Sequence, residues 1–126
     1  RVAAGKLEKL SVFGDDYDTP DGTGVRDYIH VDDVASAVTC LLNYEGAERV
    51  FNVGSGQGHS INDIIALLKN CMTVPEPRHV PARGFDVASN VLDTSRLTTE
   101  TSWRCAIPLG EGIVRVYHSM REAMKQ

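Results

Sequence analysis

The sequence predicts a small mixed α/β domain, and three observations lead to this fold class. Its 126 residues suffice for one domain with a modest hydrophobic core. Hydrophobic residues make up 42% and charged residues 24% of the chain, which is typical of globular proteins. Short β-type segments alternate with stretches of helical periodicity, but two long βαβ units are missing, so we do not expect a complete dinucleotide-binding fold.

The first third of the chain is expected to hold two extended segments and one helix. Leu10–Phe13 is a short strand candidate. A loop rich in aspartate and glycine follows from Gly14 to Gly24, and Arg26–Val31 alternates like an extended segment. We expect Asp32 to be the N-cap of a helix. The apolar residues of this helix recur at helical spacing: Val34, Ala37, Val38, Leu41 and Leu42.

The middle of the chain contains a strand candidate, a glycine-rich loop and a second helix. Arg49–Val53 has the composition of a strand. The glycine-rich loop spans residues 54–59, and Ser60 with Asp63 resembles a capping box. Apolar residues at helical spacing continue from there to Leu68, which predicts a helix.

The last third begins with an irregular or edge-like segment, because prolines recur between residues 75 and 81. Asn90–Leu92 is a weak strand candidate, and Asp93 is expected to cap a short helix that reaches toward Trp103. A C-terminal helix is expected from Glu111 onward. Its apolar face comprises Ile113, Val114, Tyr117, Met120 and Met124.

Composition and charge exclude several classes of function. The net charge of −4 and the scattered lysines argue against a nucleic-acid partner. No apolar run is long enough to cross a bilayer, and no signal-peptide pattern opens the chain. Cys40, Cys71 and Cys105 are odd in number and widely spaced, so we expect reduced thiols in a cytoplasmic protein. The histidines are also dispersed, and no metal site is expected.

The first residues point to a longer parent protein. The chain starts at Arg1 instead of methionine, and residues 1–5 resemble the last turn of a helix that stops at Gly5. A helix this short does not form alone. We therefore expect the chain to be a piece of something longer.

Two arginine-containing motifs are candidates for ligand binding. Arg26 and Tyr28 would point to the same face of a strand and could reach one ligand, such as a phosphate next to a flat group. Arg83-x-x-Asp86 lies in a loop rich in proline and glycine, where the arginine could hold a diphosphate and the aspartate a ribose. Surface ion pairs and a half-buried tyrosine explain the same residues, so both interpretations stay open on spacing alone.

The groups needed for hydride chemistry are not found. Gly54-x-Gly56-x-Gly58 has neither the spacing of the dinucleotide fingerprint nor the lysine of a P-loop, which favours a tight turn near a helix N-terminus. No tyrosine is followed by lysine at the Tyr-x-x-x-Lys spacing of short-chain dehydrogenases. We therefore expect no catalytic and no cofactor-binding residue in this chain.

Taken together, the motifs resemble a known family. The runs Leu10–Tyr17 and Asp21–Asp33 closely resemble the C-terminal half of UDP-glucose 4-epimerases, which belong to the extended short-chain dehydrogenase/reductase family. Gly22–Asp33 is specific to the epimerase-like branch. The similarity continues through Val50–Gly56, Ser60-Ile61-x-Asp63, Arg83-x-x-Asp86, Asp93-x-Ser95-Arg96 and Ser102-Trp103.

This resemblance implies a division of labour within the parent enzyme. Residues 1–126 would form a single C-terminal UDP-sugar-binding domain, while an N-terminal Rossmann domain outside the chain would bind NAD and carry the catalytic groups. The implied reaction is epimerisation at C4 of UDP-glucose, UDP-galactose or their N-acetyl forms, and the chain alone is expected to be inactive. The implied substrate-binding residues are Ser11 and Phe13 beside the uracil, Arg26 and Arg83 on the diphosphate, Tyr28 and Ile61 against the nucleotide, and Asp86 on the ribose.

Other functions stay open from the sequence. The chain could be a stand-alone, non-catalytic nucleotide-binding or assembly module, or part of a UDP-sugar dehydratase, decarboxylase or reductase. A shortened stretch between Asn70 and Arg83, and the lack of an aromatic residue in 87–90, leave the sugar undetermined. Surface normally covered by the missing domain would be apolar, so self-association into a homo-oligomer is also expected.

Overall fold

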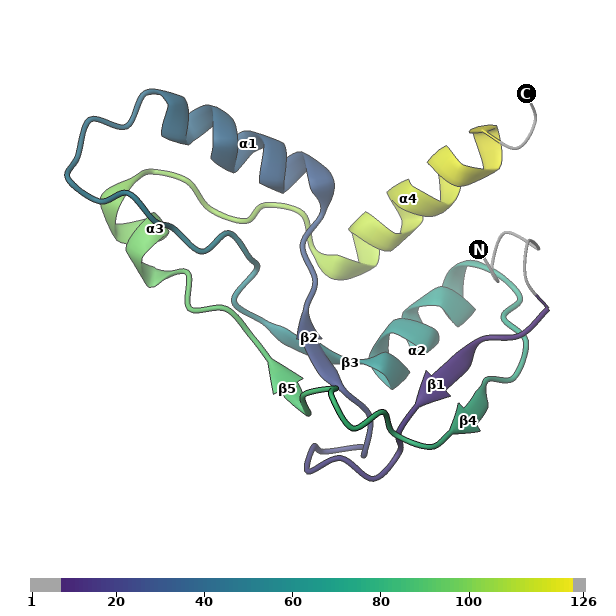
Figure 1. Ribbon diagram of the computed structural model, residues 1–126. Coiled ribbons are helices and arrows are strands. Elements are labelled where there is room, and N and C mark those ends of the chain that lie inside the picture. Colours follow the sequence, from purple (N-terminus) through teal and green to yellow (C-terminus); the bar gives the residue numbers. More distant parts are fainter. Residues whose placement is uncertain (1–7, 124–126) are drawn as a thin grey trace.

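The computed structural model describes residues 8–123, which form two arms joined by a small sheet (Figure 1). In chain order the elements are β1 (Ser11–Phe13), β2 (Val25–Asp27), α1 (Val31–Leu42), β3 (Gly58–Ser60), α2 (Ile61–Cys71), β4 (Arg78–Val80), β5 (Ser89–Asn90), α3 (Ser95–Glu100) and α4 (Leu109–Ala123). One arm holds α1 and α3, the other holds α2, β1 and β4, and β2, β3 and β5 lie between them. The expected mixed α/β class is confirmed.

Two separate ladders organise the strands. β1 pairs in parallel with β4, and β2 lies between an antiparallel β3 and a parallel β5. Because β4 belongs to one ladder and β5 to the other, residues 81–88 run from the first sheet to the second. The loop that carries the Arg83-x-x-Asp86 motif is therefore anchored at both ends.

Helices α1 and α2 both start with a side-chain cap, and that of α1 differs from the prediction. The capping box of α2 is confirmed: Ser60 Oγ accepts from the Asp63 N–H at 3.0 Å, and Asp63 Oδ2 accepts from the Ser60 N–H at 2.9 Å. The expectation that Asp32 caps α1 is wrong. His30 is the N-cap, and its Nδ1 accepts from the Asp32 N–H at 3.2 Å, while Asp33 turns inward.

The strand predicted over Arg49–Val53 does not form. Both edges of β2 are taken by β3 and β5, and residues 49–53 pair with none of the described strands. Phe51 and Val53 instead pack against the core of the α1 arm. The Phe51 ring also meets the Tyr44 ring edge-on, with centroids 5.1 Å apart. The strand-like composition of residues 49–53 thus serves packing against the core and not pairing with another strand.

Further differences concern glycine and proline. β3 forms within the predicted glycine-rich loop, where a side chain on Gly58 would come within 2.8 Å of Val25 and Val91. β4 forms in the proline-rich segment as an edge strand of the two-stranded sheet.

Thr94, not Asp93, is the N-cap of α3, although the Asp93 carboxylate accepts from the Ser95 N–H at 2.9 Å. The end of the expected C-terminal face and the expected first helical turn lie outside the described residues.

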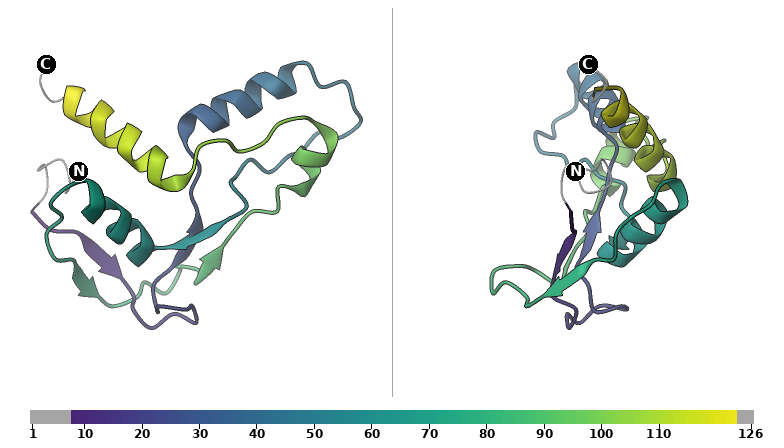
Figure 2. Two further views of the ribbon diagram at one scale, coloured as in Figure 1. Left: turned by 180° about the vertical axis from the view of Figure 1, so that it is seen from behind. Right: turned by 90° about the vertical axis from the view of Figure 1, so that its right-hand side faces the viewer.

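The hydrophobic core is small because the molecule is thin. The side view in Figure 2 is much narrower than the front view, so few side chains are enclosed from both sides. Ala37 of α1, Leu97 of α3 and Trp103 form the buried cluster of one arm. In the other arm, Val12 of β1 and Ile65 of α2 are buried. Polar contacts must therefore hold much of the remaining chain in place.

The Asp27 carboxylate fastens three segments together. At the end of β2, it accepts N–H bonds from Ser55 at 2.8 Å, Gly56 at 2.9 Å and Leu92 at 3.4 Å. Burial raises the pKa of Asp27, but the bonds from Ser55, Gly56 and Leu92 outweigh it, so the pKa is lowered. The charged form is thus the one that the fold stabilises.

Asp33, in the helix that follows β2, performs a similar role. Its side chain, in the first turn of α1, accepts N–H bonds from Ala106 at 3.2 Å and Ile107 at 2.9 Å and an S–H bond from Cys105 at 3.3 Å. The residue is only 3% exposed. Burial raises its pKa, the Ile107, Ala106 and Cys105 bonds lower it, and the net shift is downward. The contact joins α1 to the segment that leads into α4.

These carboxylates predict a specific loss of stability in acid. Their folded pKa values lie below the unfolded value of about 3.9, so the free energy they contribute is present above that pH and is lost as pH falls through the folded pKa values. Replacing Asp33→Asn should lower the free energy of unfolding at neutral pH by roughly 2 kcal/mol and flatten the acid slope. Urea unfolding from neutral to acidic pH, followed by Trp103 fluorescence, measures both. The exposed Asp18→Asn is the matched control, and an unchanged acid slope in Asp33→Asn would contradict the assignment.

Candidate functional site

Three of the sequence-predicted binding residues meet on the loop 81–88. Arg83 donates through Nε to Asp86 Oδ2 at 2.7 Å and through an Nη to Asp86 Oδ1 at 3.0 Å, a two-pronged ion pair. The Asp86 N–H closes the turn on the Arg83 carbonyl at 3.0 Å. The Arg83 guanidinium carbon lies 4.4 Å from the centre of the Phe13 ring. The structure thus joins a cation, an anion and an aromatic face at one place.

Arg26 holds the other end of the same loop. It donates to the Val87 carbonyl at 2.7 Å, to the Ala88 carbonyl at 3.4 Å and to its own neighbour Val25 at 2.7 Å. These acceptors are neutral oxygens, so they do not cancel the positive charge of the guanidinium. Arg26 and Arg83 thus place two guanidinium groups along one short segment, with that of Arg83 paired to Asp86, and guanidinium groups suit the recognition of phosphates.

Ser11 and Ile61 take different positions relative to this cluster. Ser11 and Phe13 share the exposed face of β1, because Val12 between them is buried. Ile61 opens α2, directly after Ser60, whose hydroxyl donates to Asp21 at 2.6 Å in the loop before β2. Ser11 is thus on the same face as the aromatic member of the cluster, while Ile61 lies next to the loop that leads into β2.

Tyr28 does not share a strand face with Arg26. β2 ends at Asp27, so the spacing argument that placed the two side chains together does not apply. Burial raises the pKa of Tyr28, against the opposing charge of Arg26. The two groups are near enough to interact electrostatically, but Tyr28 lies in a different environment.

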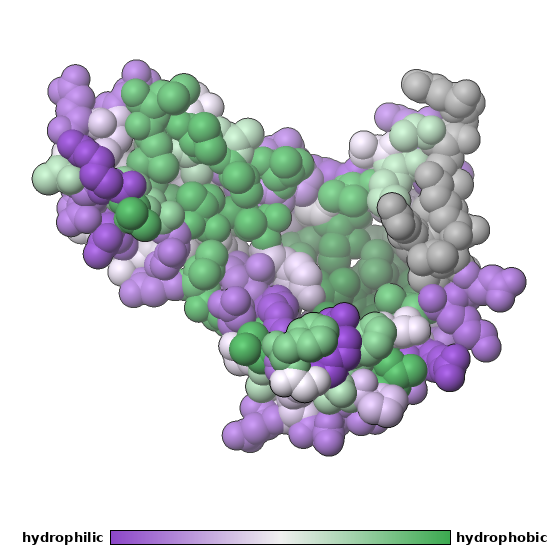
Figure 3. Space-filling view, in the orientation of Figure 1, coloured by the Kyte–Doolittle hydropathy of each residue, from purple (hydrophilic) through white to green (hydrophobic). Residues whose placement is uncertain are grey.

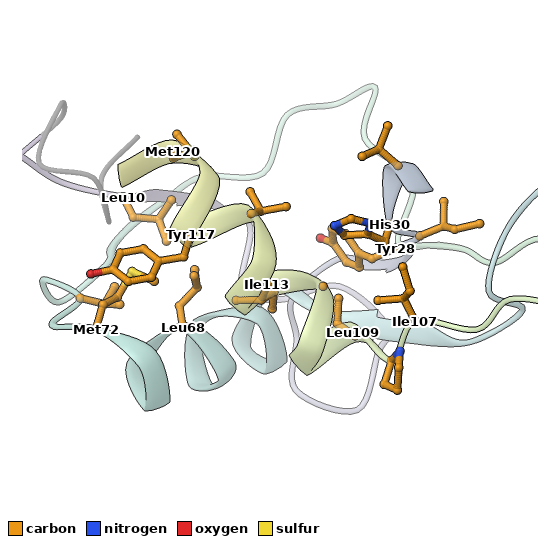
Figure 4. A pocket seen from close by; sticks show the side chains of 16 residues that line it. Leu10, Tyr28, His30, Leu68, Met72, Ile107, Leu109, Ile113, Tyr117 and Met120 are labelled. Carbon is orange, nitrogen blue, oxygen red and sulfur yellow. The ribbon is translucent and has the colours of Figure 1, made fainter. Parts of the chain in front are cut away.

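That environment is a large apolar cavity. Its volume is about 580 Å³, and Figure 4 shows Tyr28 and His30 at one end, with Leu10, Tyr117 and Met120 at the other. Side chains of α2 and α4, among them Leu68 and Ile113, line its length. The described lining includes neither lysine nor arginine, so this space suits an apolar group and not a diphosphate.

A second cavity, of about 390 Å³, lies beside the glycine-rich loop. Ser55, Gln57 and His59 line it together with Cys105. The Ser55 and Gly56 N–H groups that a phosphate would need already donate to Asp27. The loop therefore lacks the free donors of a phosphate-binding turn.

We also looked for a reactive thiol, a metal site and a membrane-spanning helix among the described residues. Burial and the neighbouring Asp33 carboxylate raise the pKa of Cys105 to about 11, so its thiol stays protonated and unreactive. Within residues 8–123, no group of three His, Cys, Asp or Glu side chains is arranged to hold a metal ion. In the same range, no helix has both the length and the apolar character needed to traverse a bilayer.

Sequence reasoning missed three residues that contact the arginine cluster, by which we mean Arg26, Arg83, Asp86 and Phe13. The carbonyls of Val87 and Ala88, which Arg26 binds, carry no signal in the sequence because every residue has one. Phe85 lies between Arg83 and Asp86, and its ring centre is 5.2 Å from the Arg83 guanidinium carbon. An aromatic residue inside an arginine–aspartate motif is a signal that the sequence interpretation left unassigned.

Comparison with known proteins identifies relatives of the chain. Residues 1–54 match the NAD dependent epimerase/dehydratase family. The UDP-glucose 4-epimerase of Bifidobacterium longum is 39% identical over 114 residues, and that of Pasteurella multocida is 38% identical over 129 residues. These alignments cover 88% and 99% of this chain but 34% and 38% of the relatives. The chain thus spans about a third of the length of the curated relatives it matches.

Solved structures give the same result for the fold. A UDP-glucose-4-epimerase from Stenotrophomonas maltophilia, with bound NAD and formylated UDP-arabinopyranose, has a TM-score of 0.86 and 43% identity and matches 98% of this chain and 38% of its own. The Bifidobacterium longum enzyme in complex with NAD⁺ and UDP has a TM-score of 0.84 and 35% identity, over 99% of this chain and 37% of its own. Sequence and fold therefore agree that this chain is a homologue of UDP-glucose 4-epimerases over about a third of their length, and its residues 1–54 match the NAD dependent epimerase/dehydratase family.

Proposed function

We propose that this chain is the C-terminal, UDP-sugar-binding portion of an NAD-dependent UDP-hexose 4-epimerase, forming one domain over residues 1–126. The observation that carries the proposal is the pair of arginines along the loop 81–88, one beside Asp86 and an aromatic ring, the other on neutral carbonyls. A diphosphate fits the two cations, and a ribose hydroxyl fits the carboxylate. The relatives whose structures contain UDP or a UDP-sugar support the same ligand class.

The role proposed for the chain is to hold the substrate, not to transform it. The described residues do not fit NAD, because the glycine-rich loop has committed two N–H donors to Asp27 and the larger cavity is apolar. We assign NAD to the part of the parent enzyme that corresponds to the uncovered length of the relatives. Fixing the UDP group by two arginines would leave the hexose free to turn, so that binding at a remote group supports chemistry elsewhere.

The exposed apolar surface of the α1 arm suits that remaining part of the enzyme. Val31, Val38 and Leu42 lie seven and four residues apart on one face of α1, and all three are exposed. Val50, in the segment after α1, is exposed as well. Figure 3 shows apolar side chains gathered over this arm and in the hollow between the arms. Since the relatives are about three times as long as the chain, we propose that their cofactor-binding portion covers this face.

We also propose where in the cell the protein is located. Cys40, Cys71 and Cys105 are free, as expected of a protein kept in a reducing compartment. We propose a cytoplasmic enzyme, in keeping with the nucleotide-sugar substrate.

UDP binding tests the site assignment. Arg83→Ala and Arg26→Ala should each weaken UDP binding by about 2 kcal/mol or more, since each removes a charge-assisted contact. Isothermal titration calorimetry measures the affinity, and circular dichroism checks that each variant is folded. Arg49→Ala is the matched control, because Arg49 is an exposed arginine in the connection between α1 and β3, where it donates to the Gly46 and Glu48 carbonyls of the same connection. Equal affinity of all the proteins would overturn the assignment.

Activity of the isolated chain tests the division of labour. The purified chain with UDP-glucose and NAD⁺ should form no UDP-galactose, because neither a catalytic tyrosine–lysine pair nor a cofactor site is found in it. Chromatographic separation of the two UDP-sugars measures turnover, with the Bifidobacterium longum relative as the positive control. Turnover by the pure chain would contradict the proposal.

Self-association tests the exposed α1 face. Without its covering partner, the apolar stripe should drive the chain to associate, so sedimentation velocity should show species larger than a monomer. The double substitution Val38→Lys and Leu42→Lys should shift the chain toward the monomer. Lysines placed instead at Thr39 and Asn43, exposed positions at or just after the end of α1, are the control. A monomeric unmodified chain would argue against this use of the face.

A further inference from the structure

Phe85 is an exposed aromatic residue at the centre of the arginine cluster. Its side chain is 79% exposed, although Phe is among the residues most often buried. It lies in the loop 81–88, between the two partners of the Arg83–Asp86 ion pair. The proposed binding of UDP by the arginines gives Phe85 no part, so its exposure requires a separate explanation.

The ring is presented from a loop that is held in place. Arg26 binds the Val87 carbonyl at 2.7 Å on one side of it, and the Asp86 N–H binds the Arg83 carbonyl at 3.0 Å across the turn. β4 and β5 fix the ends of the loop in two different sheets. The position of Phe85 is thus set by its backbone, without burial of the ring. A side chain that is positioned but uncovered is available to a ligand.

The surroundings of Phe85 favour flat groups. The guanidinium of Arg83 lies 5.2 Å from the Phe85 ring centre and 4.4 Å from that of Phe13, which is itself 42% exposed. A guanidinium is planar and stacks on aromatic faces, as a nucleobase does. Two exposed rings around a planar cation therefore make a surface on which a nucleobase could stack, next to the cations that suit its phosphates.

We propose that Phe85 contacts the nucleobase of the bound nucleotide through the exposed face of its ring. This inference rests on the proposed function, because it takes the arginine cluster to be the diphosphate site. The ligand class that it specifies is a nucleoside diphosphate rather than a sugar diphosphate without a base. Phe85 acts in binding only and has no part in the chemical step.

The affinity test separates the base from the phosphates. Phe85→Ala should weaken binding of UDP about tenfold, the loss expected for one base–aromatic stack, and should leave binding of inorganic pyrophosphate within about twofold of the unmodified chain. The exposed ring makes no buried contact, so the variant should fold. Val87→Ala is the matched control: Val87 is an exposed apolar residue of the same loop, and the substitution keeps the carbonyl that Arg26 binds. Calorimetry with both ligands measures the effects.

Fluorescence gives a readout that a structural role would not change. UDP should quench the emission of the indole introduced by Phe85→Trp, and pyrophosphate should not. Val50→Trp, at an exposed apolar position beyond α1, is the control and should show no quenching by either ligand. The native Trp103 is buried and provides the constant background.

The outcomes distinguish this inference from the proposed function. If UDP binds and Arg83→Ala weakens it, but Phe85→Ala does not, the role of Phe85 is wrong and the diphosphate site stands. An equal loss of UDP and pyrophosphate in Phe85→Ala would also refute the base contact. If the unmodified chain does not bind UDP at all, the proposed site fails and the inference fails with it.

Discussion

The Asp27 carboxylate ties the central strand β2 to the segments on both of its sides. In a thin molecule, a sheet of three short strands is not enclosed from both sides, and the buried apolar side chains lie in the arms on either side of it. Asp27 compensates by collecting N–H groups from the glycine-rich loop and from the segment after β5. One charged group thus positions the neighbours of β2 on both of its edges. The N–H groups of Ser55 and Gly56 donate to Asp27 and are therefore not available to a ligand. The glycine-rich loop thus has a structural role.

Local patterns and strand pairing differ in how far the sequence could predict them. Several local signals were confirmed: the capping pattern of Ser60 and Asp63 and the periodicity of the helices correspond to what the structure shows, although the caps of α1 and α3 lie at other residues than expected. Strand pairing could not be predicted in this way. The apolar segment 49–53 lies outside every described ladder, while the glycine-rich stretch at Gly58 pairs with β2. Which strand obtains an edge is decided by competition across the whole fold, and no window of sequence contains that information.

The candidate site shows a similar division. The Arg83–Asp86 ion pair is local, so its spacing alone indicated that the two could meet. The approach of Phe13 to Arg83 depends on the pairing of β1 with β4, which only the assembled fold provides. Tyr28 illustrates the opposite error: the strand that would have aligned it with Arg26 ends one residue too early. The hydrogen bonds of Arg26 to the carbonyls of 87 and 88 had no sequence signature at all.

The arrangement of the loop 81–88 between two ladders also has a consequence for folding kinetics. β1 must find β4, and β2 must find β5, and in both cases the partners are separated by more than half of the described chain. Contacts of such high sequence separation are slow to form, because a long loop must close before they contribute any stability. The loop 81–88 is therefore expected to be ordered late, after the helices. A nucleotide that binds only the ordered loop would act as a thermodynamic trap for the completed fold, and the protein would gain stability in proportion to the logarithm of the ligand concentration.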